Sequence, residues 1–325
     1  MLRKLYWSAR SLFASPPPPA PDFYSRFGGL WTDRRDALAE LDRRAKADPA
    51  VAALRDKLAF FIRNGYAILE GAVDHQAIDA YKADLLAAAR NNSTPLVASV
   101  PVHGPQDKDV VPLAQADLDA PLTKVLDTYV HLPSALSLAF ADPIVQFLKI
   151  VFDDGLLAFQ GLHFERGSTQ AVHQDTAYVV LEQPMHLCAS WIALEDVQPG
   201  SGELMYYEGS HRLPDWLYGG AYKHYNHERD KHEEHMGHLK ALVDRSEEQG
   251  LPLRTFLPKK GDALIWSADL AHGGSQITDP SLTRRSLVTH YTDASTKPYY
   301  FRFLPADRQK IVPVKPDCAF TSMYY

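Results

Sequence analysis

Long apolar runs, cysteines and an excess of basic charge are all scarce in this sequence of 325 residues. The longest apolar candidate, 136–152, is interrupted by Asp142 and Lys149, so it falls short of the roughly 20 apolar residues that cross a bilayer. We therefore expect no transmembrane segment. The two cysteines, Cys188 and Cys318, lie far apart, and Cys188 sits in an apolar run typical of a buried strand. This pattern favours a reducing, cytoplasmic setting over a disulfide scaffold.

The charge balance bears on the choice of partner. The formal net charge is −6, and the sequence contains no stripe of lysine and arginine that would displace counterions from a phosphate backbone. Nucleic acid is therefore not expected as a partner, and no protein partner is predicted either. A length of 325 residues and a hydrophobic content of 46% are ordinary for a globular chain and argue against the disordered and fibrous classes.

The first 21 residues differ from the rest of the chain. Residues 1–13 are basic and amphipathic, but they lack the continuous apolar core of a secretory signal, so we expect them to be retained. One interpretation is a weak contact with the inner face of a membrane or with a partner, and the other, which we favour, is a mobile tail. The proline-rich stretch 16–21 then acts as a stiff linker to the folded part, which begins at residue 22.

The middle of the sequence predicts helices followed by strands. Helical spacing of apolar residues predicts two helices within 33–64 and further helices at 74–90, 133–140 and 142–151, with a short strand at 66–69. Segment 91–119 lacks periodicity and is predicted to be a long surface loop bordering a pocket. After Gly155, strands are predicted at 156–164, 186–194, 203–207, 263–266 and 286–291.

This order predicts an α+β chain built on an antiparallel sandwich or barrel. We divide it into a tail and linker (1–21) and a single domain (22–325). That domain comprises a helical part (22–154), a β core (155–295) that carries a flap insertion (214–250), and a C-terminal extension (296–325).

The flap contains five histidines, namely His224, His227, His232, His235 and His238. A second metal site is one interpretation. The charged residues around them, and the absence of cysteine among them, favour a solvated helix near the site instead.

Two segments far apart in sequence supply metal-ligand chemistry. His173 and Asp175 stand two residues apart, so on an extended strand both side chains would point to the same face. His272 follows an apolar strand and precedes Gly273-Gly274, where the missing side chains allow close backbone approach. Two imidazoles and one carboxylate on one side of a metal form the facial triad of non-haem Fe(II) oxygenases.

An arginine follows at the start of the last predicted core strand. Arg284 shares a face with Ser286, Val288 and His290 by alternation, whereas Arg285 points the other way. A planar guanidinium suits a carboxylate of a keto acid bound to iron, so one of these two arginines is the candidate, and the alternative for either is a solvent-facing strand residue.

These residues belong to an ordered set of motifs. The set comprises His173-Gln174-Asp175, residues 191–196 (WIALED), 199–204 (PGSGEL), Gly209-Ser210-His211, His272-Gly273-Gly274 and Arg284. From about Phe60 to Tyr291 the sequence resembles the phytanoyl-CoA dioxygenase family, and the set in this order is far more specific than any one motif.

The resemblance implies a double-stranded β-helix, a jelly-roll or cupin-like core, flanked by N-terminal helices. It implies Fe(II) as cofactor, 2-oxoglutarate and O₂ as co-substrates, and His173, Asp175 and His272 as iron ligands. It favours Arg284 over Arg285 as the 2-oxoglutarate contact, and it places Trp191 and Gln160 beside the co-substrate. Asp175 is intact, whereas halogenating relatives carry a small residue there, so the resemblance implies hydroxylation, with release of succinate and CO₂. The implied substrates range from acyl-CoA esters to small metabolites and lipid- or glycan-linked molecules.

Two other functions remain open at this point. One is a catalytically silent member of the fold that only binds a ligand, and the other is a cupin-like metalloenzyme that does not use 2-oxoglutarate. Gly209-Ser210-His211 is interpreted as a structural turn at the pocket rim, because a third histidine ligand would close a site to O₂. Trp191, taken from its strand alone, would equally fit plain core packing.

Overall fold

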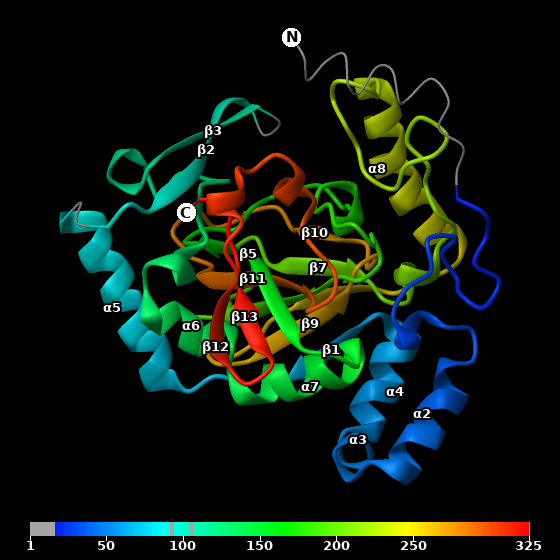
Figure 1. Cartoon of the computed structure of the whole chain (residues 1–325). Coiled ribbons are helices and arrows are strands. Elements are labelled where there is room, and N and C mark those ends of the chain that lie inside the picture. The colour runs from blue at the N-terminus through cyan, green and yellow to red at the C-terminus, as the bar shows by residue number, and fades with distance from the viewer. Residues whose placement is uncertain (1–16, 92–93, 105–106, 325) are drawn as a thin grey trace.

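The computed structural model describes residues 17–91, 94–104 and 107–324. The basic segment 1–13 lies outside these residues, so what was predicted for it stays a prediction. The helices are α2 (Ala37–Ala47), α3 (Pro49–Ala53), α4 (Arg55–Asn64), α5 (His75–Asn91), α6 (Pro133–Ala139), α7 (Asp142–Phe152) and α8 (His232–Glu248) (Figure 1).

The segment predicted to hold two helices forms three. Asp48 ends α2 and caps α3, because its side chain accepts a hydrogen bond from the Ala50 N–H at 2.8 Å while Pro49 occupies the first helical position. α3 then stops after one turn and α4 restarts at Arg55. α4 ends at Gly65, whose φ of 82° suits glycine and turns the chain into the first strand.

The strands form two sheets. They are β1 (Tyr66–Leu69), β2 (Val97–Gly104), β3 (Asp107–Pro112), β4 (Lys124–Leu126), β5 (Leu156–Phe164), β6 (Cys188–Ala193), β7 (Leu204–Tyr207), β8 (Leu253–Phe256), β9 (Ala263–Ser267), β10 (His272–Gly274), β11 (Ser286–Asp293), β12 (Val312–Lys315) and β13 (Cys318–Phe320). The large sheet has the order β1-β9-β6-β11-β5-β4-β2-β3, with β13 also beside β5, and the small sheet has the order β10-β7-β8. All core pairings around β11 are antiparallel.

One hydrophobic cluster lies between the two sheets. The large sheet contributes side chains such as Trp191, Trp266 and Val288, and the small sheet contributes Tyr206 and Phe256. The alternation predicted for β11 is present, because Val288 faces this cluster while its neighbour Leu287 faces the helices. The predicted α+β class with a double-stranded β-helix core is confirmed.

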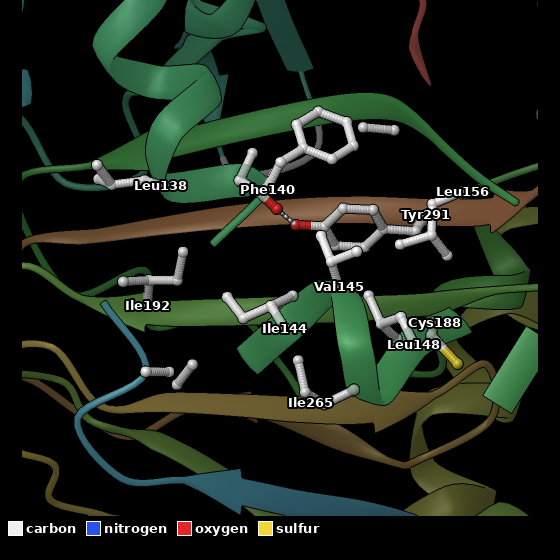
Figure 2. Packing of buried hydrophobic residues seen from close by; sticks show 14 of the residues in the cluster. Leu138, Phe140, Ile144, Val145, Leu148, Leu156, Cys188, Ile192, Ile265 and Tyr291 are labelled. Carbon is white, nitrogen blue, oxygen red and sulfur yellow. Dashed lines mark hydrogen bonds between the residues drawn. The ribbon is translucent and has the colours of Figure 1, made fainter. Parts of the chain in front are cut away.

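The outer face of the large sheet packs against the helices. Figure 2 shows this layer, in which Ile144 and Leu148 of α7 meet Cys188 and Ile265 of the sheet. The Tyr291 hydroxyl donates to the Ala139 carbonyl at 2.6 Å, which satisfies the one polar group that this tyrosine buries. Both cysteines are free and buried. The helices therefore hold the sheet from outside and leave its inner face to form a site.

The prediction of a long loop at 91–119 was wrong. The segment contains the β2–β3 hairpin, with Ser99 paired to both Val110 and Lys124, and it extends the large sheet beyond β5. Its prolines and acidic residues hid the alternation, because β3 is a polar edge strand. In Figure 1 this hairpin and α8 project from the same end of the barrel.

Within the described residues, no single helix is long and apolar enough to span a membrane. α6 and α7 pass that test only together, but they are bent by 55° at their junction. Leu138 and Phe147 from this pair are fully buried in the core.

Candidate metal centre

Two histidines and one aspartate converge at one end of the barrel. His173 and His272 exchange backbone hydrogen bonds of 2.9 Å in both directions, which places their rings side by side. Each ring directs Nδ1 to a carbonyl oxygen, that of Ala171 at 2.8 Å and that of Leu270 at 2.9 Å. Nδ1 therefore carries the proton and Nε2 the free lone pair, which is the tautomer that binds a metal. The two Nε2 atoms lie 3.8 and 3.7 Å from Oδ1 of Asp175.

The route to this convergence differs from the expected one. His173 and Asp175 do not share a regular strand, since His173 forms an isolated bridge with His272 and Asp175 opens a short 3-10 turn, Asp175–Ala177. The bridge to β10, rather than strand alternation, brings the three side chains together. Their candidate ligand atoms all lie within 4.8 Å of one another, and the three residues are buried.

Gly273 and Gly274 make the close approach possible. A Cβ on Gly273 would lie 2.7 Å from the Gln170 carbonyl oxygen, and one on Gly274 would lie 2.8 Å from the Thr169 nitrogen. Any side chain would push β10 away from the segment that carries His173. The expectation that these glycines allow backbone contact is met by this geometry.

The second oxygen of Asp175 is held by two groups that sequence reasoning had not assigned. Trp266 donates its indole N–H to Oδ2 at 2.7 Å, and His290 Nε2 lies 3.3 Å from the same atom. Although burial raises the pKa of Asp175, His272 and His290 hold it far below its usual range. Burial, reinforced by His272, lowers the pKa of His173 to about 3. At neutral pH the centre therefore offers a carboxylate oxygen and a neutral imidazole.

Arg284 is a buried cation that forms no ion pair within the described residues, although the Glu203 carboxylate is near enough to raise its pKa slightly. It is 2% exposed, and its guanidinium carbon lies 5.4 Å from the ring centroids of both Phe164 and Trp191. Among the described residues, its Nε has no hydrogen-bond partner. Burial lowers the pKa of Arg284 to about 10, so it stays charged at neutral pH. Leaving such a group unpaired is costly, which indicates a place for an anion.

Arg285 points the other way and is paired. Its guanidinium donates to Glu165 at 2.6 Å and to Glu195 at 2.8 Å, and a third of its side chain is exposed. The two neighbouring arginines thus differ as strand alternation predicts, one inside the barrel and one on its surface.

Lys124 of β4 is a second buried basic residue near Arg284, and sequence reasoning missed it. Its ammonium lies 5.3 Å from the Phe164 ring centroid, on the inner face near Arg284. Burial, with Lys108 nearby, lowers the pKa of Lys124 to about 7. Three-residue β4 is too short for alternation to show in the sequence, so only the fold reveals which way this lysine points.

Trp191 and Gln160 both lie on inner strands around this space. Trp191 is 2% exposed and packs edge-on against Phe256, so it also belongs to the core as the plain interpretation held. Gln160 is partly exposed, and its Cα lies opposite that of His290 on β11. The structure therefore places Trp191 beside Arg284 and Gln160 beside the residue that supports Asp175.

A sequence model of phytanoyl-CoA dioxygenase (PhyH) matches residues 61–286, which is more than two thirds of the chain. The chain belongs to the phytanoyl-CoA dioxygenase family. No curated protein sequence gave a match.

Several solved structures share the fold of this chain. The non-haem α-ketoglutarate-dependent epimerase SnoN from nogalamycin biosynthesis is 20% identical, with a TM-score of 0.56, and the match covers 77% of this chain and 84% of that one. The carbocyclase SnoK from the same biosynthesis is 17% identical, with a TM-score of 0.55 and coverage of 77% and 90%. The apoform of EctD from S. alaskensis is 16% identical, with a TM-score of 0.51 and coverage of 74% and 77%. At these identities the likeness shows the shared fold.

The residues present fit the family's chemistry. Two imidazole nitrogens and one carboxylate oxygen form a donor set suited to Fe(II) with open positions, and a buried guanidinium whose Nε has no partner among the described residues suits the far carboxylate of 2-oxoglutarate. Fe(II), 2-oxoglutarate and O₂, expected from the sequence, are thus confirmed as the cofactor and co-substrates of the family.

The flap reaches the metal centre through Tyr178. The Tyr178 ring lies edge-on to the His173 ring at 5.5 Å, and its hydroxyl lies 3.2 Å from Nε2 of His235 in α8. Nδ1 of His235 lies 3.1 Å from the Tyr218 hydroxyl, which also contacts Nδ1 of His238 at 2.6 Å. A chain of hydrogen bonds therefore runs from the mouth of the site into the flap.

The prediction that the histidine-rich helix is solvated was wrong for one of its faces. His235 and His238 are 1% and 3% exposed, and they share the inner side of α8 with Leu239 and Leu242 at helical spacing. His232, the first residue of α8, is exposed. The charged neighbours in the sequence masked this amphipathic pattern, because histidine counts as polar in such an analysis.

His211 contacts the scaffold and not the metal centre. Its Nε2 lies 3.2 Å from the Ile62 carbonyl oxygen, and its ring fills the space where a Cβ of Gly65 would be. Ser210 accepts a hydrogen bond from the Ala271 N–H at 2.8 Å. Both contacts agree with the interpretation of Gly209-Ser210-His211 as a structural turn.

Proposed function

We propose that this protein is an Fe(II)- and 2-oxoglutarate-dependent dioxygenase that hydroxylates a small-molecule or a lipid- or glycan-linked substrate. Residues 22–325 act as one oxygenase domain. His173, Asp175 and His272 hold the iron, and Arg284 holds the far carboxylate of 2-oxoglutarate.

The observation that carries the proposal is that a set of three metal ligands and the buried guanidinium of Arg284 occur together on the inner side of the barrel. A metal site alone would fit many reactions. Arg284, buried with no partner on Nε among the described residues, requires an anion nearby, and 2-oxoglutarate supplies one while its other end chelates iron. Lys124 lies on the same inner face, where burial lowers its pKa to about 7, so a bound dianion would draw it into the protonated, positively charged form.

Bound iron supplies the oxidative chemistry, namely decarboxylation of 2-oxoglutarate to succinate and CO₂ with oxidation of a C–H bond. The protein supplies geometry and a dry enclosure. Trp266 and His290 fix one oxygen of Asp175 and leave Oδ1 directed at the two imidazoles. Trp191, packed beside Arg284, excludes water from the guanidinium, which strengthens its attraction for a carboxylate. Gln160 is proposed as a further polar contact to 2-oxoglutarate.

Hydroxylation is proposed over other outcomes because the carboxylate ligand Asp175 is present, whereas halogenation needs a free position there. SnoN and SnoK, an epimerase and a carbocyclase, share the fold with this chain. The incorporation of ¹⁸O from ¹⁸O₂ into the product distinguishes hydroxylation, which retains one oxygen atom, from epimerisation or ring closure.

Substrate choice is proposed to depend on the two segments that project from the mouth end of the barrel, the β2–β3 hairpin and the flap 214–250 (Figure 1). Tyr178 is 41% exposed beside His173, so it is the aromatic side chain placed to meet a substrate.

The test is succinate formation from 2-oxoglutarate by the full-length protein with Fe(II) and O₂, in the presence of a metabolite mixture. The proposal expects succinate only when 2-oxoglutarate and Fe(II) are both present. Binding of ligand without any succinate would indicate a silent fold member. Product formation in the absence of 2-oxoglutarate would indicate a cupin-like metalloenzyme of another class.

A further inference from the structure

Lys223 of the flap is buried between two carboxylates that belong to different parts of the chain. Its Nζ lies 2.6 Å from Oδ1 of Asp215 and 2.5 Å from Oδ2 of Asp269. The side chains of Lys223 and Asp269 are 3% and 2% exposed. Burying a charged lysine costs desolvation free energy that only its two carboxylate partners offset, so these partners determine its position.

Asp269 is connected to both segments that carry the proposed iron ligands. Its Oδ1 accepts the Thr176 hydroxyl at 2.6 Å, and its backbone carbonyl accepts the side-chain amide of Gln174 at 2.8 Å. These two residues flank Asp175. In the other direction, Asp269 precedes Leu270, whose carbonyl oxygen holds the ring of His272.

Asp215, the second carboxylate that holds Lys223, is anchored as well. Asp215 accepts the Ser25 hydroxyl at 2.9 Å and the Arg26 backbone N–H at 2.8 Å. The flap therefore starts from a fixed point between the N-terminal segment and the ligand loops. The start of the flap, at Asp215 and Lys223, is therefore a fixed part of the site, and the flap does not open as one rigid lid.

We propose that Lys223 is a positioning residue for the iron site, acting through Asp269 on the segments of Asp175 and His272. The inference rests on the proposed function. Without the ammonium, the carboxylates of Asp215 and Asp269 face each other in a buried space with no cation between them, and Asp269 moves away or takes up a proton. Either change loosens Thr176 and the turn before His272. Groups that orient metal ligands in this way typically contribute about 10- to 100-fold to metal affinity.

The experiment measures Co(II) binding to the metal-free full-length protein by visible absorption, with Co(II) standing in for Fe(II). Lys223→Met is expected to weaken Co(II) binding by about 10- to 100-fold. Lys240→Met is the matched control, because Lys240 forms a 2.5 Å ion pair with Asp244 on the exposed side of α8. That control should bind Co(II) as the wild type does. Equal affinity in Lys223→Met and wild type would overturn the proposal.

A second variant covers the case in which Lys223→Met fails to fold. Lys223→Met/Asp269→Asn removes the repulsion, and the asparagine oxygen still accepts the Thr176 hydroxyl. It should fold and bind Co(II) more tightly than Lys223→Met, where that protein is folded, but at least about threefold more weakly than wild type, since the anchor to the flap is gone. Wild-type affinity in the double variant would show that Lys223 is dispensable.

The proposed function has its own separate outcome in this experiment. If wild type does not bind Co(II), or if Asp175→Ala binds it equally well, the proposed iron site itself is wrong. If wild type binds and Asp175→Ala does not, a normal affinity in the Lys223 variants contradicts only the inference about Lys223.

Discussion

Trp266 donates its indole N–H to Oδ2 of Asp175 at 2.7 Å, while Oδ1 of the same carboxylate faces His173 and His272. The two oxygens thus have separate tasks. One is fixed by the barrel wall, and the other is presented to the metal position.

Trp266→Phe should therefore weaken metal binding without unfolding the barrel. The phenyl ring fills most of the space, but Oδ2 loses its short hydrogen bond and the carboxylate can rotate. We expect Fe(II) affinity to fall by about 10- to 100-fold, measured by anaerobic titration. Trp216→Phe is the control, because the buried indole N–H of Trp216 has no hydrogen-bond partner among the described residues. An unchanged affinity in Trp266→Phe would show that this hydrogen bond does not orient the ligand.

Arg284 and Arg285 form a matched pair for testing co-substrate binding. Arg284→Ala should raise the apparent KM for 2-oxoglutarate at least about thirtyfold, because a charge-assisted contact in a buried space contributes on the order of 2 to 5 kcal/mol. Arg284→Lys keeps the charge without the planar fork and should fall between.

Arg285→Ala should leave that KM nearly unchanged. Its partners Glu165 and Glu195 lie on the face of the strand opposite to Arg284, so the substitution removes no contact with the inner space. A large rise in KM for Arg285→Ala and none for Arg284→Ala would show that Arg285, and not Arg284, binds 2-oxoglutarate.

Gly274→Ala tests the close approach of β10 to the segment of His173. The added Cβ would lie 2.8 Å from a backbone nitrogen, so the strand must shift and His272 with it. We expect loss of metal binding and a destabilisation of about 1 to 3 kcal/mol.

Gly237→Ala is the counterpart in α8, where a Cβ would meet only the Trp216 ring at 3.8 Å. It should stabilise the protein by about 0.5 to 1 kcal/mol in urea unfolding, because alanine favours the helix. Equal effects of the two substitutions would show that the contact at Gly274 does not constrain the site.

The sequence predicted much of the site because its signals are local. His173, Asp175, His272 and Arg284 each stand in a short motif. Alternation along one strand put Arg284 and Arg285 on opposite faces, and the family resemblance favoured Arg284. The strands β5, β6, β7, β9 and β11 were predicted to within a few residues because each is an apolar run bounded by turn residues, whereas β8 and β10 were not predicted.

The rest depended on contacts between distant segments. Nothing near Trp266 or His290 in the sequence indicates that both reach Asp175, since the register of three strands decides it. The same holds for Lys223, whose partners are 8 and 46 residues away. The β2–β3 hairpin was missed because a polar edge strand lacks the apolar alternation on which such predictions rest.

The buried His211 should make the free energy of unfolding fall at acid pH. Burial, with Arg212 nearby, lowers the pKa of His211 to about 3, below the ordinary value of 6.5. Its contribution to folding is therefore fully present above pH 6.5 and is lost as the pH falls from 6.5 toward 3, where the unfolded state binds the extra proton. Between pH 7.5 and 5 this residue alone removes about 2 kcal/mol.

His211→Gln should reduce the loss of unfolding free energy between pH 7.5 and 5 by that amount, measured by urea unfolding of the metal-free protein. The variant is expected to be less stable than wild type at pH 7.5, because the packing against Gly65 changes. The same pH dependence in both proteins would mean that His211 is protonated when folded.

The central claim is that His173, Asp175 and His272 bind one iron. Anaerobic Fe(II) titration of the wild type and of the three single alanine variants, with folding checked by circular dichroism, tests it most directly. We predict one Fe(II) per chain in the wild type and no tight Fe(II) binding in any variant, with the fold retained in all. Full Fe(II) binding by a folded His173→Ala, Asp175→Ala or His272→Ala protein would contradict the account.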